Sequence, residues 1–339
     1  MFLQSIIARL AFVPHARRRT LAVTSTFTRF LLLFLSIMLS NRPALARNER
    51  TPLLSLLPSP SLLSPAKPLP LGASIETISE HFLGSPFRDS ALGEGEGEGE
   101  GEGDRESAPS GKDRTRALYD SDPKFRIDAF DCTTFVETVW AMSFSKPPLD
   151  WTQSLQTIRY REGVPSFVNR LHFVSLDWMP YQIARGALVD ITALIGPPLS
   201  QSLTLIDRKA WYKKLHPSEL KNFETRFPQE VAQRVLTTYL SFSALLDAPL
   251  AVSTLKNELK KGALLVNFIR PDWDTVRWIG TRIDVSHQGF LLVKGDEIMM
   301  RHASAPHRQV IETNFLEYIR YHRHHPSLKG IQVVRILTL

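Results

Sequence analysis

The sequence predicts an α+β fold, with helices in the first part of the domain and a sheet in the last part. Apolar residues recur at helical spacing in several segments after residue 72, whereas three short apolar runs after residue 262 have the composition of strands. We find no internal repeat of about 20–50 residues, which a repeat architecture would require. Hydrophobic residues make up 43% and charged residues 22% of the chain, a balance typical of a globular protein.

The first 46 residues have the features of an export signal. Six Arg and no acidic residue lie in this segment, and "RFLLLFLSIML" (29–39) forms an apolar run of ~10 residues, too short for a membrane span. "ALA" (44–46) then has the small-x-small form of a cleavage site. We therefore predict a signal peptide at 1–46 and a bacterial protein exported to the periplasm or cell envelope. If the leader stays uncleaved, the chain is instead anchored in the membrane.

The net charge of +7 comes almost entirely from this leader, because removing its six Arg leaves +1. The remaining sequence has no basic stripe with interleaved aromatic residues. A nucleic-acid partner is therefore not expected.

Two segments are predicted to be disordered. Residues 47–71 are rich in Pro, Ser and Leu without a steady period, which is typical of a tether. Residues 92–114 contain alternating Gly and Glu, which bury no apolar area and repel each other. Because too little chain precedes this run to make a separate domain, we expect it to be a loop inside a single domain at 72–339.

Helices are predicted first. "ASIETISEHFLGSPF" places Ile75, Ile78 and Phe82 on one helical face and Gly84 at its end. A second helix is expected at 128–143. The region from about 150 to 250, which includes "HPSELKNFETRFPQEVAQRVLTTYLSFSALL", is predicted to be mainly helical, divided by Gly and Pro.

Strands are predicted in the last third. "GALLVNFI" (262–269), "SHQGFLLVKGDEIMMRHAS" (286–304) and "GIQVVRIL" (330–337) have strand composition, and the middle segment turns at Lys294-Gly295-Asp296. "TNFLEYIRYHRHH" predicts a short helix before the last strand.

Cys132 is the sole cysteine of the chain, so an intramolecular disulfide is excluded. A lone cysteine is often a small buried hydrophobe. The alternative is a nucleophile, which attacks as the thiolate and needs an environment that favours the anion. Cys132 stands in "FDCTTFVETVW", where a helix is expected to begin and its free N–H groups and dipole favour negative charge.

A nucleophilic cysteine also needs a histidine base that a third polar group orients. His287 starts the strand "SHQGFLLV", and His302 lies on the next strand at a similar distance from the turn. The two can therefore be cross-strand neighbours, with Cβ atoms about 4.5–5.5 Å apart if directly opposite. We predict a Cys–His–His relay, and expect Gly289, which lacks a side chain, to leave room for a substrate.

Other histidines have weaker claims. The sequence leaves open whether His172 lines a cleft or lies in the core. His322, His324 and His325 form a polar cluster, but no Cys or carboxylate follows at ligand spacing, so we predict no metal site. No cofactor is expected.

Taken together, these motifs resemble the N-acetylmuramoyl-L-alanine amidase-like family, which belongs with the NlpC-type, papain-like cysteine peptidases. "FDCTTFVETVWA", "DVSHQGFLL" and "RHAS" carry the resemblance, with "ISEHFLGSPF" and "ALGEG" before them, "IRYREG" and "RLHF…DW" between them, and "GIQVVRI" at the end. It runs from about Ser74 to Ile336. Two features depart from the pattern: the expanded Gly-Glu run, and Gly262-Ala263 where Gly-Asp is usual.

The resemblance implies a papain-like core, circularly permuted or in the standard order, in which a Cys-bearing helix packs on an antiparallel sheet. It implies that Cys132 is the nucleophile, His287 the base and His302 the orienting residue. The backbone N–H of Cys132 would help to form the oxyanion hole. Arg161, His172 and Asp177 fall in family-like segments and are candidate substrate-binding residues, with structural ion pairs or buried hydrogen bonds as the alternative.

The activity implied is hydrolysis of an amide in peptidoglycan, with a muropeptide as the partner. The bond is either the lactyl–L-alanine amide or a peptide bond within the stem, such as the D-γ-glutamyl–diamino acid bond. A non-catalytic wall-binding module with the same fold is the alternative from another class.

Overall fold

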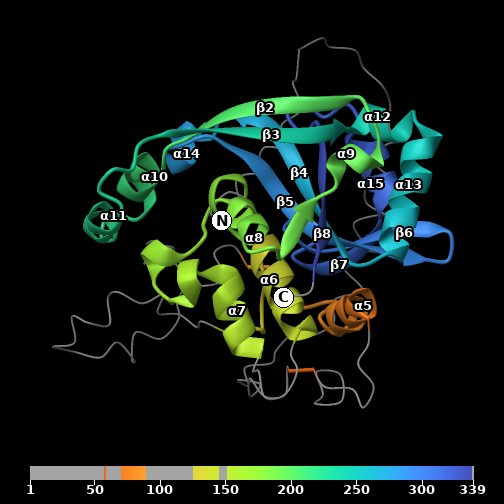
Figure 1. The fold of residues 1–339 in the computed structure, drawn as a ribbon, viewed down its shortest axis with the longest axis horizontal. Coiled ribbons are helices and arrows are strands. Elements are labelled where there is room, and N and C mark those ends of the chain that lie inside the picture. Colours follow the sequence, from red (N-terminus) through yellow and green to blue (C-terminus); the bar gives the residue numbers. More distant parts are fainter. Residues whose placement is uncertain (1–56, 59–69, 89–124, 145–150, 338–339) are drawn as a thin grey trace, which may run out of the picture.

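An antiparallel sheet of eight strands forms the centre of the computed structural model, which describes residues 57–58, 70–88, 125–144 and 151–337 (Figure 1). The strand order is β2-β3-β8-β4-β5-β6-β7, and β1 pairs with one end of β8 beside this path. The strands are β1 (Leu188–Asp190), β2 (Leu199–Ile206), β3 (Gln233–Ser241), β4 (Leu264–Trp273), β5 (Ile283–Lys294), β6 (Glu297–Ser304), β7 (Gln309–Asn314) and β8 (Gly330–Ile336).

Helices and short helical turns surround the sheet (Figure 1). Short 3₁₀ helices occupy Arg161–Gly163 and Phe167–Asn169, and a π-helical turn occupies Val174–Trp178. The α-helices are α5 (Leu71–His81), α6 (Cys132–Ser143), α7 (Trp151–Arg159), α8 (Met179–Ala184), α9 (Thr192–Ile195), α10 (Arg208–Leu215), α11 (Leu220–Arg226), α12 (Phe242–Leu246), α13 (Pro249–Lys260), α14 (Val276–Ile279) and α15 (Phe315–His322).

The sheet is buried on both faces, which makes the molecule a three-layer structure at its centre. On one face, Leu265 and Phe290 pack with side chains of α5, α6 and α7. On the other face, Leu264, Val266 and Phe268 pack with side chains of α12, α13 and α15. Since successive side chains of a strand point to opposite faces, burial on both faces explains the uninterrupted apolar run at the start of β4.

The mixed architecture of helices and antiparallel sheet that the α+β prediction requires is present. The predicted helix at 128–143 begins four residues later, at Cys132, and the predicted hairpin at 286–304 is formed by β5 and β6. The predicted strands at 262–269 and 330–337 overlap β4 and β8, and the short helix predicted between the last two strand segments is α15. The signal peptide at 1–46, nearly all of the tether at 47–71 and the Gly-Glu loop at 92–114 lie outside the described residues.

The prediction of a mainly helical region from 150 to 250 was wrong in part. β1, β2 and β3 lie in it, and "QRVLTTYLS" forms β3 rather than a helix. All eight residues of β2 pair with β3, and the end of β3 pairs with β8. The backbone hydrogen bonds that these partners supply override a local pattern compatible with a helix.

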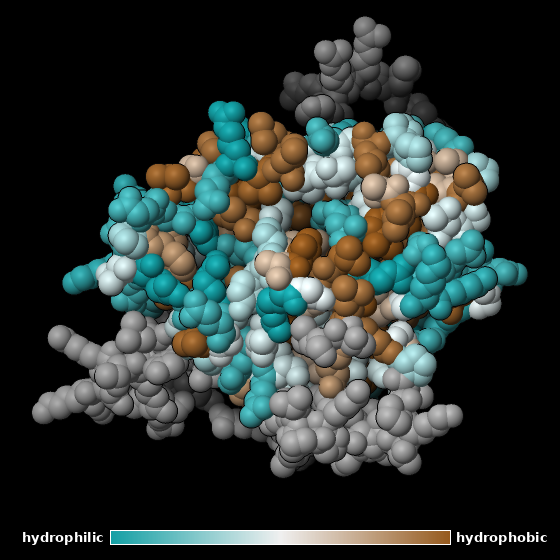
Figure 2. Space-filling view, in the orientation of Figure 1, coloured by the Kyte–Doolittle hydropathy of each residue, from teal (hydrophilic) through white to brown (hydrophobic). Residues whose placement is uncertain are grey.

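Figure 2 shows brown apolar patches among teal polar ones on the upper part of the surface, where Figure 1 places β2 and β3. Leu203 and Leu205 of β2 and Leu236 of β3 are exposed. In the part of the chain that the structure describes, no helix is both long enough and apolar enough to cross a membrane.

Candidate active site

Cys132 is the first residue of α6. Asp131 caps the helix, because its carboxylate accepts hydrogen bonds from the backbone N–H groups of Thr133 (2.9 Å) and Thr134 (2.8 Å). The Thr134 hydroxyl in turn accepts from the backbone N–H of Asp131 at 2.9 Å, which completes a capping box. The Cys132 side chain is buried, with 5% of its surface exposed. The helix start thus holds the thiol at the positive end of the helix dipole.

A bulge in β5 positions His287. His287 pairs with Phe268 of β4, but the next pair is Ile269 with Val285, so Ser286 is an extra residue in the strand. Bulges bend a strand and re-aim its side chains, and they are common beside active sites. His287 is partly buried and lies directly after this irregularity.

His287 and His302 form a hydrogen-bonded pair. The distance from Nε2 of His287 to Nδ1 of His302 is 2.6 Å, and the ring centroids are 4.7 Å apart. The predicted proximity is confirmed, but the two residues are diagonal rather than directly opposite. The register pairs Phe290 with Arg301, so Gly289 is the residue across from His302.

The role predicted for Gly289 was wrong. A Cβ atom on Gly289 would lie 3.1 Å from the Cβ of His302 and 3.1 Å from the carbonyl oxygen of Arg301. The missing side chain therefore makes room for His302 and the neighbouring strand, rather than for a substrate.

Burial keeps both imidazoles neutral. It lowers the pKa of His287 to about 3, and the nearby charges of Arg270 and His322 act in the same direction. Burial also lowers the pKa of His302 well below its ordinary value, with further contributions from His287 and His307. At neutral pH both rings are therefore neutral, and the N–H of one ring donates to the unprotonated nitrogen of the other.

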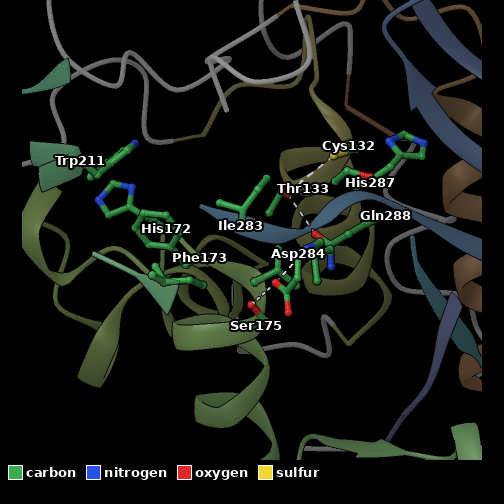
Figure 3. Close-up of a pocket in the computed structure, with 14 residues that line it drawn as sticks. Cys132, Thr133, His172, Phe173, Ser175, Trp211, Ile283, Asp284, His287 and Gln288 are labelled. Atoms are coloured by element: carbon green, nitrogen blue, oxygen red, sulfur yellow. Dashed lines mark hydrogen bonds between the residues drawn. The ribbon is translucent and has the colours of Figure 1, made fainter. Parts of the chain in front are cut away.

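Cys132 and His287 line one cleft of about 70 Å³, together with His172, Trp211 and Asp284. Figure 3 shows Cys132 and His287 at one end of this cleft, with His172 and Trp211 at the other end. Ile283 lies between these two ends in the same view. The cleft thus brings together the predicted nucleophile, the predicted base and one of the three predicted substrate-binding residues.

Arg161 and Asp177 do not line this cleft. Asp177 is 4% exposed, and its Oδ1 lies 2.5 Å from Nη1 of Arg208 and 3.7 Å from Nη2 of Arg161. Burial raises the pKa of Asp177, and the charge of Arg208 is the largest influence that opposes it. These contacts are those of the structural ion pair that the sequence left open as the alternative, and a role of Asp177 and Arg161 in substrate binding stays a prediction.

His172 is held at the far end of the cleft. Its Nε2 lies 2.7 Å from the carbonyl oxygen of Phe167, and its ring is 4.8 Å from that of Trp211. Trp211 comes from α10, in the region that was predicted only as helix, and no sequence motif pointed to it.

Asp284 was not singled out from the sequence, although it stands in the motif "DVSHQG". Its carboxylate is 1% exposed and accepts hydrogen bonds from the hydroxyls of Ser175 (2.5 Å) and Thr237. Burial raises its pKa, and these hydrogen bonds oppose the rise. The signal in the sequence was an aspartate three positions before a histidine of a predicted strand. The hydroxyl partners of its carboxylate lie 109 and 47 positions away in the sequence, so no local pattern predicts them.

A chain of polar side chains links the cleft to the centre of the sheet. The Thr133 hydroxyl donates to Oε1 of Gln288 (3.0 Å), and Nε2 of Gln288 donates to Oδ1 of Asn267 (2.9 Å). The amide of Asn267 then donates to Gln332 (3.0 Å). These bonds fix α6 against β5, β4 and β8, which sets the distance between the cysteine-bearing helix and the histidine-bearing strand.

Among the described residues, no group of three or more His, Cys, Asp or Glu is arranged to hold a metal ion. His322 and His325 have ring centroids 5.9 Å apart and belong to the lining of a second cavity.

The fold and the cleft define a protein of mixed helices and antiparallel sheet, in which a thiol at a helix start and one imidazole of a hydrogen-bonded histidine pair line a common cleft. Residues 113–327 match the family model described as N-acetylmuramoyl-L-alanine amidase-like (AmiA-like). Since this match covers more than half of the chain, the protein belongs to that family. No protein of curated function matches the chain in sequence.

Solved structures are similar over most of the chain. A Legionella pneumophila protein of the family DUF1460 is 27% identical, with 79% of this chain and 90% of that chain covered and a TM-score of 0.65. An N-acetylmuramoyl-L-alanine amidase from Bacteroides uniformis is 21% identical, with 79% and 99% covered and a TM-score of 0.52. A Bacteroides fragilis protein named as a candidate xylanase is 22% identical, with 76% and 99% covered and a TM-score of 0.51. The last two show likeness of fold alone.

Proposed function

We propose that the protein is a cell-wall hydrolase that cleaves an amide bond of peptidoglycan muropeptides, as an N-acetylmuramoyl-L-alanine amidase-like enzyme. The 2.6 Å bond between His287 and His302, beside a cysteine at a helix start in the same cleft, carries this proposal. Membership of the amidase-like family supports the substrate class. In this proposal the core is papain-like and of NlpC type, and the cysteine is the nucleophile.

The proposed reaction begins with proton transfer from the Cys132 thiol to Nδ1 of His287. The thiolate attacks the amide carbonyl carbon, and the carbonyl electrons move to an oxygen that the backbone N–H of Cys132 stabilises. His287 then gives its proton to the leaving amine as the C–N bond breaks, which leaves a thioester on Cys132. Water, deprotonated by His287, attacks the thioester and releases a carboxylic acid and the free thiol.

His302 acts in this scheme by orienting His287. If Nδ1 of His287 accepts the thiol proton, its Nε2 carries hydrogen and donates to Nδ1 of His302. The proton of neutral His302 then sits on its own Nε2. One tautomer of each ring is therefore selected, as a third residue does in other cysteine and serine hydrolases.

We also propose that the protein works outside the cytoplasm, in the bacterial periplasm or cell envelope. The basic leader, its short apolar run and the "ALA" sequence at 44–46 support export. Peptidoglycan lies in the same compartment, so this location agrees with the proposed substrate.

The test is incubation of the purified protein with muropeptides beside Cys132→Ala, with the products identified by mass spectrometry. The wild type is expected to release fragments, and the mass of those fragments identifies the bond. We expect Cys132→Ala to lose at least about 10³-fold in turnover, because it lacks the nucleophile. His324→Gln is a matched control, because His324 is exposed and lines neither this cleft nor the second cavity.

Free peptide and intact glycan would identify an amidase, whereas a shortened stem peptide would identify an endopeptidase. If the wild type and Cys132→Ala are equally inactive while both bind cell wall, the enzyme proposal is wrong and the fold serves as a binding module.

A further inference from the structure

A second, larger cavity adjoins the cleft of Cys132. It has a volume of about 390 Å³, and Ser286 and His287 line both it and the first cleft. Its other walls come from β4, β6 and β7 and from α15, whose Tyr318 packs on Phe268 at 5.2 Å and on His302 at 6.1 Å. The two cavities therefore meet at Ser286 and His287, and His302 lines the second cavity but not the thiol cleft.

Three buried polar atoms belong to residues that line this cavity. Nε of Arg270, Nε2 of His302 and Oγ1 of Thr313 make no hydrogen bond within the described part of the chain. Arg270 is 7% exposed and His302 is 3% exposed. Buried polar groups in proteins almost always have a partner, because an unmade hydrogen bond costs about 1–3 kcal/mol. Three residues that line one cavity thus each carry a polar atom that the described part of the protein leaves without a partner.

The charge of the cavity is positive. Arg270 donates through Nη1 to the Ser327 hydroxyl and stacks on Trp273, with Cζ 4.7 Å from the ring centroid. Among the described residues no carboxylate lies within ion-pair distance of this guanidinium, and no Asp or Glu is among those that line the cavity. A buried charge is costly unless it is paired, and guanidinium groups bind carboxylates with particular strength.

The tautomer of His302 adds a second donor. When His287 is a base toward Cys132, the proton of His302 lies on Nε2, which is the atom without a partner. Arg270 Nε–H and His302 Nε2–H are then both donors, and the Thr313 hydroxyl can donate as well. A group that only accepts hydrogen bonds complements this set.

Part of the remaining lining is apolar. It includes Phe268, Ile311 and Leu328 and the ring of Tyr318. A volume of about 390 Å³ lies within the range of small-molecule sites, about 300–1,000 Å³. Simple inorganic anions would leave this apolar surface without contact, so an organic anion fits better.

We infer that this cavity binds the carboxylate of an organic ligand, with Arg270 as the charged anchor and His302 and Thr313 as hydrogen-bond donors. The carboxylate belongs either to the muropeptide itself, in which case the inference rests on the proposed function, or to a separate small acid. Both sources present the same chemistry to Arg270.

Binding of the carboxylate has a consequence for the neighbouring base. The charge of Arg270 is one of the causes that lower the pKa of His287. A carboxylate beside Arg270 offsets that charge and moves the pKa of His287 upward, which makes it a stronger base toward the thiol. Occupation of the cavity would therefore increase the rate of the chemical step.

Benzoate and benzamide form a matched pair of probes, because they share a shape and differ in charge. Calorimetric titration of the full-length wild type should show benzoate binding at least tenfold more tightly than benzamide. Arg270→Gln and Thr313→Val should each reduce this preference, and Arg270→Lys should keep part of it. Arg320→Gln, an exposed arginine on α15 outside the cavity lining, should leave the preference unchanged.

Equal affinity of the wild type for benzoate and benzamide would overturn the inference without any variant. Retention of the full preference in a folded Arg270→Gln protein, as judged by circular dichroism, would also overturn it. If benzoate binds and competes with muropeptide hydrolysis, the carboxylate site belongs to the substrate. If benzoate binds and changes turnover without competition, the ligand is a separate acid. Because binding is read without hydrolysis, failure of the proposed activity leaves this result intact.

Discussion

Gly289 faces His302 across β5 and β6, where a methyl group would be too close to three atoms. Its Cβ would lie 3.1 Å from the Cβ of His302 and 3.2 Å from Cγ of Met300. We expect Gly289→Ala to lower the free energy of unfolding by about 1–3 kcal/mol, the usual cost of overpacking. We also expect a loss of muropeptide turnover, because the displaced ring breaks its 2.6 Å bond to His287.

Urea unfolding and a turnover assay measure the two effects of this substitution. Gly72→Ala is the control, because its added Cβ would meet only atoms at 3.7 Å or beyond and lies in helix α5. An unchanged turnover for Gly289→Ala would contradict the role assigned to the histidine pair.

The pKa of His287 sets a prediction for activity against pH. Since that pKa is lowered to about 3, His287 stays neutral and able to accept a proton in mildly acidic solution. We expect the acid limb of kcat/KM to fall below pH 5, well under the ordinary histidine value of about 6.5. Arg270→Gln removes a cation near the ring and should move the limb to higher pH. A wild-type limb at pH 6.5 would contradict the prediction.

Site residues could be predicted where their spacing within one local element determines how close they lie. The turn at Gly295 relates His287 to His302 within one hairpin, so counting from the turn was enough to bring them together. Asp177 could not be assigned in this way, because its partner Arg208 lies 31 positions away on another helix. The ion pair between Asp177 and Arg208 forms because separate elements pack together, so no local spacing predicts it.

At the scale of the element, the start of α6 joins helix stability to the position of the nucleophile. Asp131 accepts hydrogen bonds from two backbone N–H groups of the first turn. We expect Asp131→Ala to lower the free energy of unfolding by about 1–2 kcal/mol, as loss of an N-cap does. Asp131→Asn keeps a capping oxygen and should lose less. Urea unfolding of the three proteins checks this order, and equal losses for the two variants would contradict it.

The strands were predictable where both faces are buried and unpredictable at β2 and β3, the edge strand and its neighbour. "LLV" at the start of β4 is apolar without interruption, because its two faces contact two different helical layers. In β3, Leu236 is exposed whereas Leu240 is buried. Pairing with β2, rather than the hydrophobic pattern of β3, sets the register of this strand. A short amphipathic run of this kind is compatible with a helix or a strand, and the pairing partner decides between them.

At the scale of the whole molecule, the buried histidines make stability depend on pH. The unfolded chain binds a proton on each histidine near pH 6.5, whereas the folded pKa of His287 is about 3 and that of His302 is also lowered. Their contribution to stability is therefore fully present above pH 6.5 and is lost as the pH falls toward the folded values. For His287 alone the loss between pH 6.5 and pH 5 is about 2 kcal/mol, at 1.36 kcal/mol for each pH unit.

Comparison of the wild type with His287→Gln isolates this dependence. The raised pKa values of Asp177 and Asp284 act in the opposite direction, since their protonated forms stabilise the fold as the pH falls, but they are common to both proteins. We expect the free energy of unfolding, measured in urea at several pH values, to decline less steeply below pH 6.5 in the variant. Because the glutamine does not titrate, the difference between the two curves should shrink by about 2 kcal/mol from pH 6.5 to pH 5. Parallel curves would mean that His287 titrates alike in the folded and unfolded chain, and would remove the basis for a neutral base at the active site.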